Sequence, residues 1–225
     1  MYSQNAKMNR LGVYLQLAIH RHGNLAAGSS TVHTFSDWEH TCSSAAHPFS
    51  AKLHCRPTVP PHRITMTFRP LKHNETELLK EFLYQAIFLP QGAEPPDRSI
   101  VELPELALYY KDFGSGRADS GIVAEDGGRP VGAVWTRIMP DYGHVDDNTP
   151  SLAISLFKEY RGRGTGTQLM QRMLESLKQQ GFERVSLSVQ KANRAVKLYE
   201  RLGFKILRET GEEYIMVREF MCSGE

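Results

Sequence analysis

The chain has 225 residues and a mass of 25.4 kDa, with 40% hydrophobic and 23% charged residues, which is typical of a globular protein of one or two domains. A formal charge of +2 does not predict binding to nucleic acid or to an anionic membrane surface, and no apolar run reaches the ~18 residues of a membrane span. Three cysteines, Cys42, Cys55 and Cys222, are too few for a disulfide framework, and we expect a cytoplasmic protein.

Residues 1–63 differ in composition from the rest of the chain. They contain six basic and two acidic residues and seven of the nine histidines. Their histidines and cysteines follow no zinc spacing, so we expect no metal. Their one apolar run, residues 11–19, lacks the cleavage site of a secretory signal. We therefore expect residues 1–63 to be a disordered or non-native leader, with Met66 as the true start, and residues 64–225 to form the domain.

Within the domain, hydrophobic periodicity predicts the elements in chain order. The predicted strands are 64–69, 121–125, 131–135, 152–157 and 185–189, followed by a closing hairpin of 205–207 and 214–217. The predicted helices are 74–90, 104–111, 167–180 and 193–203. This order predicts an α/β fold with a mixed sheet, because the β-α-β unit requires parallel strands and the hairpins require antiparallel ones, with helices on both faces.

A glycine-rich segment, Arg161-Gly162-Arg163-Gly164-Thr165-Gly166, joins a predicted strand to a predicted helix. It lacks the Gly-Lys-Ser/Thr ending of a Walker loop, and Thr167 stands where a dinucleotide fingerprint has its third glycine. It does fit the pattern Arg/Gln-x-x-Gly-x-Gly/Ala. Unpaired N–H groups at the start of the helix would suit a phosphate, although a turn without a ligand is the alternative.

One strand later comes Asn193-x-Ala195-x-x-Leu198-Tyr199-x-x-Leu202-Gly203-Phe204. With the glycine-rich segment and the element order, it resembles the GCN5-related N-acetyltransferase (GNAT) family from about residue 64 to residue 220, in a less-described bacterial-type branch. The resemblance implies a GNAT-like, mostly antiparallel sheet with one splayed parallel pair. It also implies acetyl-coenzyme A as cosubstrate, no metal and no covalent enzyme intermediate.

By resemblance, acetyl-coenzyme A would lie in the gap between the splayed strands. The residues implied for it are Ile154, Ser155, Leu156, Arg161, Gly162, Arg163, Gly164, Thr165, Gly166, Thr167 and Asn193. The first three would pair their backbone with the pantetheine arm, the glycine-rich loop would wrap the pyrophosphate, and the Leu156 N–H would stabilise the oxyanion. Tyr199 would protonate the leaving thiolate. The alternatives are a core aromatic for Tyr199 and a helix cap for Asn193.

The base that deprotonates the amine is less defined. Glu102 is the candidate we select, beside Glu105, in a region that lines the acceptor side in the family. The loop acids and histidine are further candidates or simply solvated residues: Asp141, His144, Asp146 and Asp147. Trp135 is predicted to be core. A small-molecule amine is the expected acceptor, with a protein N-terminus or lysine, or a non-catalytic coenzyme A-binding module, as alternatives. Oligomeric state stays open, a homodimer included.

Overall fold

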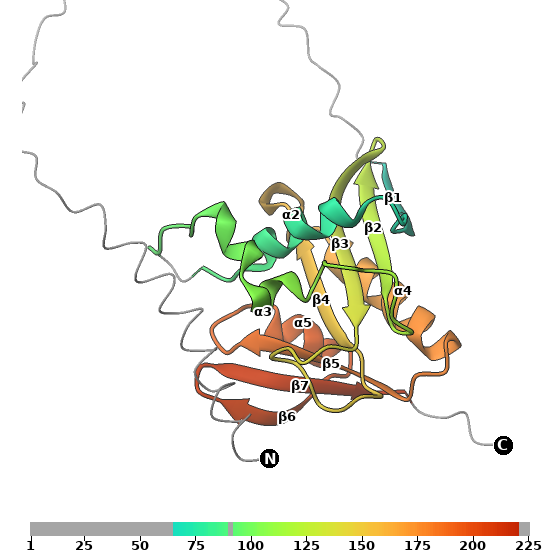
Figure 1. Cartoon of the computed structure of the whole chain (residues 1–225), viewed down its shortest axis with the longest axis vertical. Coiled ribbons are helices and arrows are strands. Elements are labelled where there is room, and N and C mark those ends of the chain that lie inside the picture. Colours follow the sequence, from blue (N-terminus) through green and yellow to red (C-terminus); the bar gives the residue numbers. More distant parts are fainter. Residues whose placement is uncertain (1–64, 90–91, 221–225) are drawn as a thin grey trace, which may run out of the picture.

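Seven strands form one sheet in the order β1-β2-β3-β4-β5-β7-β6 in the computed structural model, which describes residues 65–89 and 92–220 (Figure 1). The strands are β1 (Met66–Pro70), β2 (Ser120–Asp126), β3 (Arg129–Arg137), β4 (Ser151–Leu156), β5 (Arg184–Gln190), β6 (Lys205–Thr210) and β7 (Glu213–Glu219). The leader predicted for residues 1–63 and Cys222 lie outside the described residues, so the domain boundary stays a prediction.

The helices are α2 (Thr76–Ala86), η1 (Arg98–Glu102), α3 (Pro104–Ala107), η2 (Lys158–Tyr160), α4 (Thr165–Gln179) and α5 (Val196–Arg201). One predicted helix is shorter than expected, and one short helix was not predicted. The helix predicted for 104–111 ends at Ala107, and the turns that follow it are held by the Arg137 guanidinium, which donates to the carbonyls of Leu108 and Lys111. The unpredicted element is the 3-10 helix η1, where the Asp97 side chain accepts from the Ser99 N–H.

All neighbouring strands pair in antiparallel fashion except β4 and β5, which are parallel. Those two share a single register pair, Ser151 with Ser186, where the Ser186 N–H donates to the Pro150 carbonyl at 2.9 Å. Beyond this point they part, whereas β3 and β4 stay paired over the full length of β4. The mixed sheet with a splayed parallel pair is thereby confirmed.

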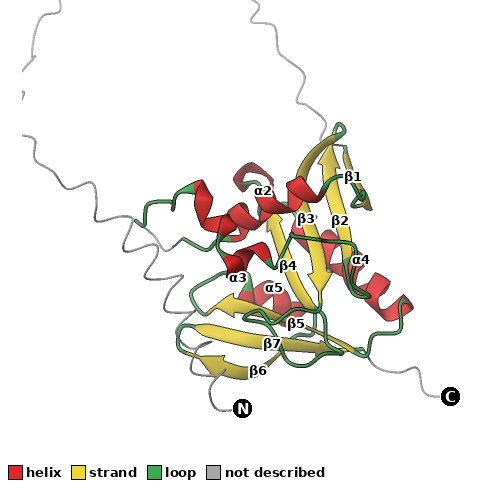
Figure 2. Ribbon diagram, in the orientation of Figure 1, coloured by secondary structure: helices red, strands yellow, loops and turns green. Residues whose placement is uncertain are grey.

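Helices cover both faces of the sheet, as predicted: α2 and α3 lie on one face and α4 and α5 on the other (Figure 2). On the α4 face, Leu169 and Met173 are fully buried; on the α2 face, Phe82 packs with Trp135. Each such side chain contributes about 1.5–3 kcal/mol by leaving water. Trp135 is 0% exposed, so its prediction as core is confirmed. None of the helices in the described part of the chain is both long and apolar enough to cross a membrane.

Candidate active site

The gap between β4 and β5 exposes backbone groups of β4. The Phe157 N–H donates to the Val131 carbonyl at 3.0 Å, so residues 151, 153, 155 and 157 direct their backbone groups at β3. Bonding direction alternates along an antiparallel strand, so Ile154 and Leu156 direct theirs at the gap. The register gives neither residue a partner on β5. An extended ligand that enters the gap could therefore form hydrogen bonds with this free edge of β4.

Ser155 is placed differently from its two neighbours. Its backbone faces β3, and its buried hydroxyl donates to the Phe82 carbonyl at 2.7 Å. Ser155 therefore anchors α2 on β4. The backbone groups available for a pantetheine arm are those of Ile154 and the N–H of Leu156, because the Leu156 carbonyl accepts from Arg161.

The loop before α4 offers a run of free donors. Gly162 and Gly164 adopt left-handed φ values of 74° and 82°, which glycine alone tolerates well. The first bond of the helix runs from the Gln168 N–H to the Gly164 carbonyl at 3.1 Å. Within the described residues, the N–H groups of 162–167 have no acceptor. A helix start of this kind, at the positive end of a 15-residue helix, suits a phosphate group.

Arg161 holds this loop in place. Its Nε donates to the Leu156 carbonyl at 2.8 Å and its Nη2 to the Gln85 carbonyl at 3.0 Å, so the side chain joins the loop to β4 and α2. Arg163 is exposed beside it. Arg161 therefore positions the loop, and Arg163 is the cation free to face an anion from solvent.

Three elements meet at Gly166. A Cβ atom at this position would lie 3.5 Å from Leu156 and 3.9 Å from Leu198. The carboxyl end of β4, the start of α4 and the helix α5 therefore border the same gap. Thr165 is buried beside Gly166, and Thr167 is half-buried.

Two further predicted site residues, Asn193 and Tyr199, lie in the turn before α5 and in α5 itself. The Asn193 Oδ1 accepts from the Ala195 N–H at 2.9 Å, which caps the turn and leaves the amide NH₂ without an acceptor in the described part of the chain. The Tyr199 ring packs on Phe204 at 5.9 Å between centroids and is 8% exposed. Its hydroxyl has no hydrogen-bond partner among residues 65–89 and 92–220, and burial raises the pKa of Tyr199 to about 12.

On the α2 face, a carboxylate lies at the point where the strands part. Asp141 accepts from the Ser151 hydroxyl at 2.6 Å and from the Tyr109 hydroxyl at 2.8 Å. Burial raises the pKa of Asp141 despite these bonds. Asp141 therefore joins β4, the segment after α3 and its own loop, residues 138–150, at one edge of the gap.

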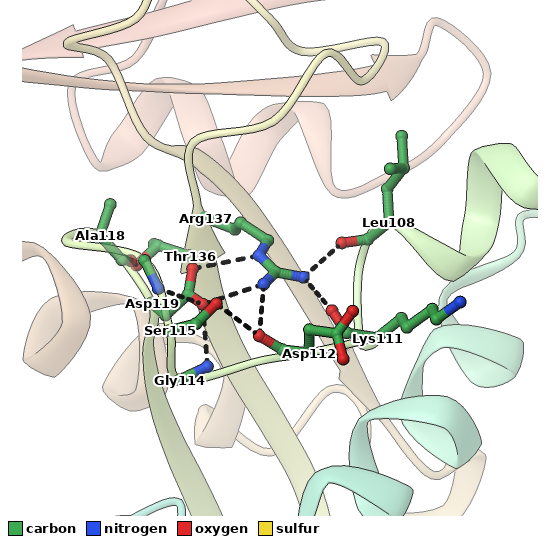
Figure 3. Close-up of polar contacts among 10 residues, drawn as sticks. Leu108, Lys111, Asp112, Gly114, Ser115, Ala118, Asp119, Thr136 and Arg137 are labelled. Carbon is green, nitrogen blue, oxygen red and sulfur yellow. Dashed lines mark hydrogen bonds and ion pairs between the residues drawn. The ribbon is translucent and has the colours of Figure 1, made fainter.

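Arg137 fixes the segment that carries Tyr109 (Figure 3). Its guanidinium donates to the carbonyls of Leu108 at 2.9 Å and Asp112 at 2.8 Å, and it pairs with the buried Asp119 carboxylate at 3.1 Å. Five N–H groups in a planar fork allow one side chain to make all these bonds. This cluster holds the α3–β2 connection against β3.

Several predicted base candidates are engaged in other contacts. Glu102 forms an ion pair with Lys80 and accepts from the Tyr110 hydroxyl at 2.9 Å. Lys80 above all lowers the pKa of Glu102, which makes its carboxylate a weaker base. Asp146 pairs with Arg184. The remaining candidates are Asp147, whose side chain is 98% exposed, His144, whose Nδ1 lies 3.0 Å from the Met139 carbonyl oxygen, and the half-buried Glu105.

One acidic residue near the gap escaped the sequence analysis. Glu213 begins β7 opposite Gln190 of β5 and accepts from the Ser188 hydroxyl at 3.1 Å. The pattern of the closing hairpin does not distinguish Glu213 from its exposed neighbour Glu212. The sequence offered one signal, the polar residue Ser188 in the strand predicted to part from its neighbour. A partner for its hydroxyl could be sought on the strand that pairs with β5 on the other side, which is β7.

Comparison with known proteins agrees with this geometry. The Acetyltransferase (GNAT) family matches residues 83–204, more than half of the chain. The chain belongs to this family. The GNAT fold is also seen in the PaiA N-acetyltransferase from Thermoplasma acidophilum in complex with coenzyme A, at a TM-score of 0.51 and 18% identity, covering 70% of this chain and 100% of that one.

Two curated relatives differ in the acceptor that their names state. The chain is 32% identical over 102 residues to N-alpha-acetyltransferase 30 of Schizosaccharomyces pombe, covering 45% of this chain and 67% of the relative. It is 41% identical over 71 residues to mycothiol acetyltransferase of Corynebacterium aurimucosum, covering 29% of this chain. The matched stretch spans only 23% of the Corynebacterium protein.

Proposed function

We propose that the protein transfers the acetyl group of acetyl-coenzyme A to an amine. The observation that carries the proposal is the junction of two features: the parted strands β4 and β5, and the run of unpaired N–H groups at 162–167 beside them. The first suits an extended, amide-bearing arm and the second a pyrophosphate. The residues of β4, the loop and Asn193 would hold the cosubstrate.

Bound acetyl-coenzyme A supplies a thioester whose carbonyl carbon accepts the amine. The Leu156 N–H would stabilise the negative charge that develops on the carbonyl oxygen, a role supported by the register that directs it at the gap. The Tyr199 hydroxyl donates a proton to the departing sulfur. With a pKa of about 12, this hydroxyl is protonated at neutral pH, and it forms no hydrogen bond with any other described residue.

A small-molecule amine is the acceptor that we propose. Polar side chains support this choice, because Asp141 bonds to Ser151 and Tyr109 where the strands part, and Arg137 holds the α3–β2 connection that carries Tyr109. A protein N-terminus is the second candidate, supported by the name and 32% identity of the Schizosaccharomyces relative.

A thiol-release assay separates these functions. Acetyl-coenzyme A would be supplied with a panel of small amines, free amino acids and peptides with unblocked N-termini, and coenzyme A binding would be followed by calorimetry. Release with small amines supports the proposal, and release with peptides alone favours the second candidate. Binding without release from any acceptor would contradict both and indicate a non-catalytic coenzyme A-binding module.

A further inference from the structure

We propose that Glu213 takes the proton from the acceptor amine, an inference that rests on the proposed acetyl transfer. The proposal starts from where the residue lies. Ser188 stands two residues beyond Ser186, the last residue of β5 with a partner on β4, so it borders the parted stretch. Its hydroxyl donates to Glu213 Oε2 at 3.1 Å, which orients the carboxylate toward that stretch.

Glu213 and Tyr199 lie on opposite faces of the sheet. Leu187 and Val189 of β5 and Met216 of β7 belong to the core under α4 and α5, which also contains Tyr199. Side chains alternate along a strand, so Ser188 and Glu213 project on the face of α2 and α3. An amine entering from the Glu213 face would attack on one side of the sheet while the thiolate leaves toward Tyr199 on the other.

The loop of residues 138–150 passes over β5 near Glu213 (Figure 1). A Cβ at Gly143 would lie 3.2 Å from the backbone nitrogen of Ser188, the residue whose hydroxyl donates to Glu213. Burial, together with the charge of Asp141, raises the pKa of Glu213. The same environment raises the pKa of Tyr142 to about 12. The titratable groups whose charge interacts with that of Glu213 are Asp141, Tyr109 and Tyr142.

None of the described cations pairs with Glu213. The two nearest along the neighbouring strands are engaged elsewhere: Lys191 pairs with Glu209 at 2.7 Å, and Arg208 donates to the His144 carbonyl at 3.3 Å. Both oxygens of Asp141 accept hydroxyl groups, whereas Glu213 Oε1 has no donor in the described part of the chain. Of Asp141 and Glu213, Glu213 is therefore the one that keeps a free oxygen for an ammonium group.

The chemistry requires such an acceptor. An alkyl amine with a pKa of ~10.4 is protonated at neutral pH and has no free electron pair. One N–H bond breaks as its proton passes to Glu213, and the freed pair forms the bond to the carbonyl carbon. The C–S bond then breaks, and the departing thiolate takes the proton of the Tyr199 hydroxyl. The nitrogen, which now carries the acetyl group and one proton too many, gives that proton back to the tyrosine. Glu213 releases its proton to solvent, so one proton is released per acetyl group transferred.

The test compares two acceptors in Glu213→Gln, a variant that keeps the shape of the side chain and its bond from Ser188. One is the best alkyl amine of the panel, and the other is its alkoxyamine analogue, which is already unprotonated at neutral pH. For the alkyl amine we expect kcat/KM to fall on the order of 10²-fold, and for the alkoxyamine less than about threefold. Coenzyme A affinity should not change.

Glu212→Gln changes the exposed chain neighbour and should behave as wild type with both acceptors. Ser188→Ala supplies an independent readout: loss of a hydrogen bond to the carboxylate should move the rising limb of the kcat/KM profile to higher pH. Equal losses for both acceptors in Glu213→Gln, or no loss, would overturn the assignment while wild-type turnover keeps the proposed function intact. Absence of wild-type turnover with every amine would instead overturn the proposed function, and this inference with it.

Discussion

The two faces of the sheet handle polar groups in different ways. On the α4 and α5 face, the groups offered to a ligand are backbone N–H groups at 162–167, in a loop at the start of α4, whose buried side is apolar. On the α2 and α3 face, side chains bond to one another across distant segments: Tyr109 and Ser151 with Asp141, Arg137 with Asp119, and Ser188 with Glu213.

This difference matches the two ligands of the proposed reaction. A cosubstrate held by backbone groups needs only a loop of the right conformation, so many side chains around it are free to vary. An acceptor is selected by side chains, whose charge and reach set specificity. Substitutions on the α4 and α5 face should therefore change the affinity for acetyl-coenzyme A. Substitutions on the α2 and α3 face should change the stability of the protein or the rate with a given acceptor.

Gly164→Asp should have the largest effect. The substitution places a side chain and a negative charge in the loop of free N–H groups, at a φ of 82°. We expect the Kd for acetyl-coenzyme A to rise on the order of 10³-fold, about 4 kcal/mol, measured by calorimetry.

Gly181→Asp is the matched control, because Gly181 follows the other end of α4 at a φ of 80° with equally open space around it. Strain of about 1 kcal/mol is expected in both variants, and the helix dipole disfavours Asp more at Gly181. Equal cofactor affinities in the two variants would show that the 162–167 loop is only a turn.

Arg137→Met tests the side-chain network on the other face. It would leave the Asp119 carboxylate, 1% exposed, without its cation, and would free the carbonyls that hold the α3–β2 connection. Breaking a buried pair in this way costs about 3 kcal/mol in the free energy of unfolding, measured by denaturant titration. Arg98→Met removes an exposed pair with Glu81 and should cost far less. Similar losses in both variants would contradict the role given to Arg137.

Tyr199→Phe tests whether the thiolate leaves on the α4 and α5 face, opposite to the face from which the amine is proposed to attack. Because the hydroxyl has no partner in the described residues, its loss should leave the melting temperature nearly unchanged. Loss of the proton donor should lower kcat on the order of 10²-fold and spare cofactor affinity. Tyr214→Phe, in the same core, should have little effect on either. An unchanged kcat in Tyr199→Phe with a good acceptor would remove its catalytic assignment.

The contrast between the faces also explains what the sequence could predict. The cofactor loop is contiguous, and its glycines are required by local backbone conformation, so Gly162 and Gly164 are recognisable without a structure. The order of elements along the chain follows from local periodicity, and the mixed sheet follows from the β-α-β unit and the hairpins. Glu213 meets Ser188 only through the pairing of β5 with β7, and Tyr109 meets Asp141 only after the helix at 104 ends early. Such contacts join residues far apart in the chain and leave no linear pattern.

Glu102→Gln should have the smallest effect, and it contrasts with Glu213→Gln on the same face. Glu102 is exposed and paired with Lys80, and this pairing lowers the pKa of Glu102. The ion pair therefore contributes stability above the ordinary glutamate pKa, and this contribution is lost as the pH falls through the lowered pKa. The glutamine variant lacks this contribution at every pH. We therefore expect a small difference in melting temperature at pH 7 that vanishes in acid, and a kcat/KM within about threefold of wild type. A loss on the order of 10²-fold in kcat/KM, confined to acceptors that are protonated at neutral pH, would instead assign the base to Glu102.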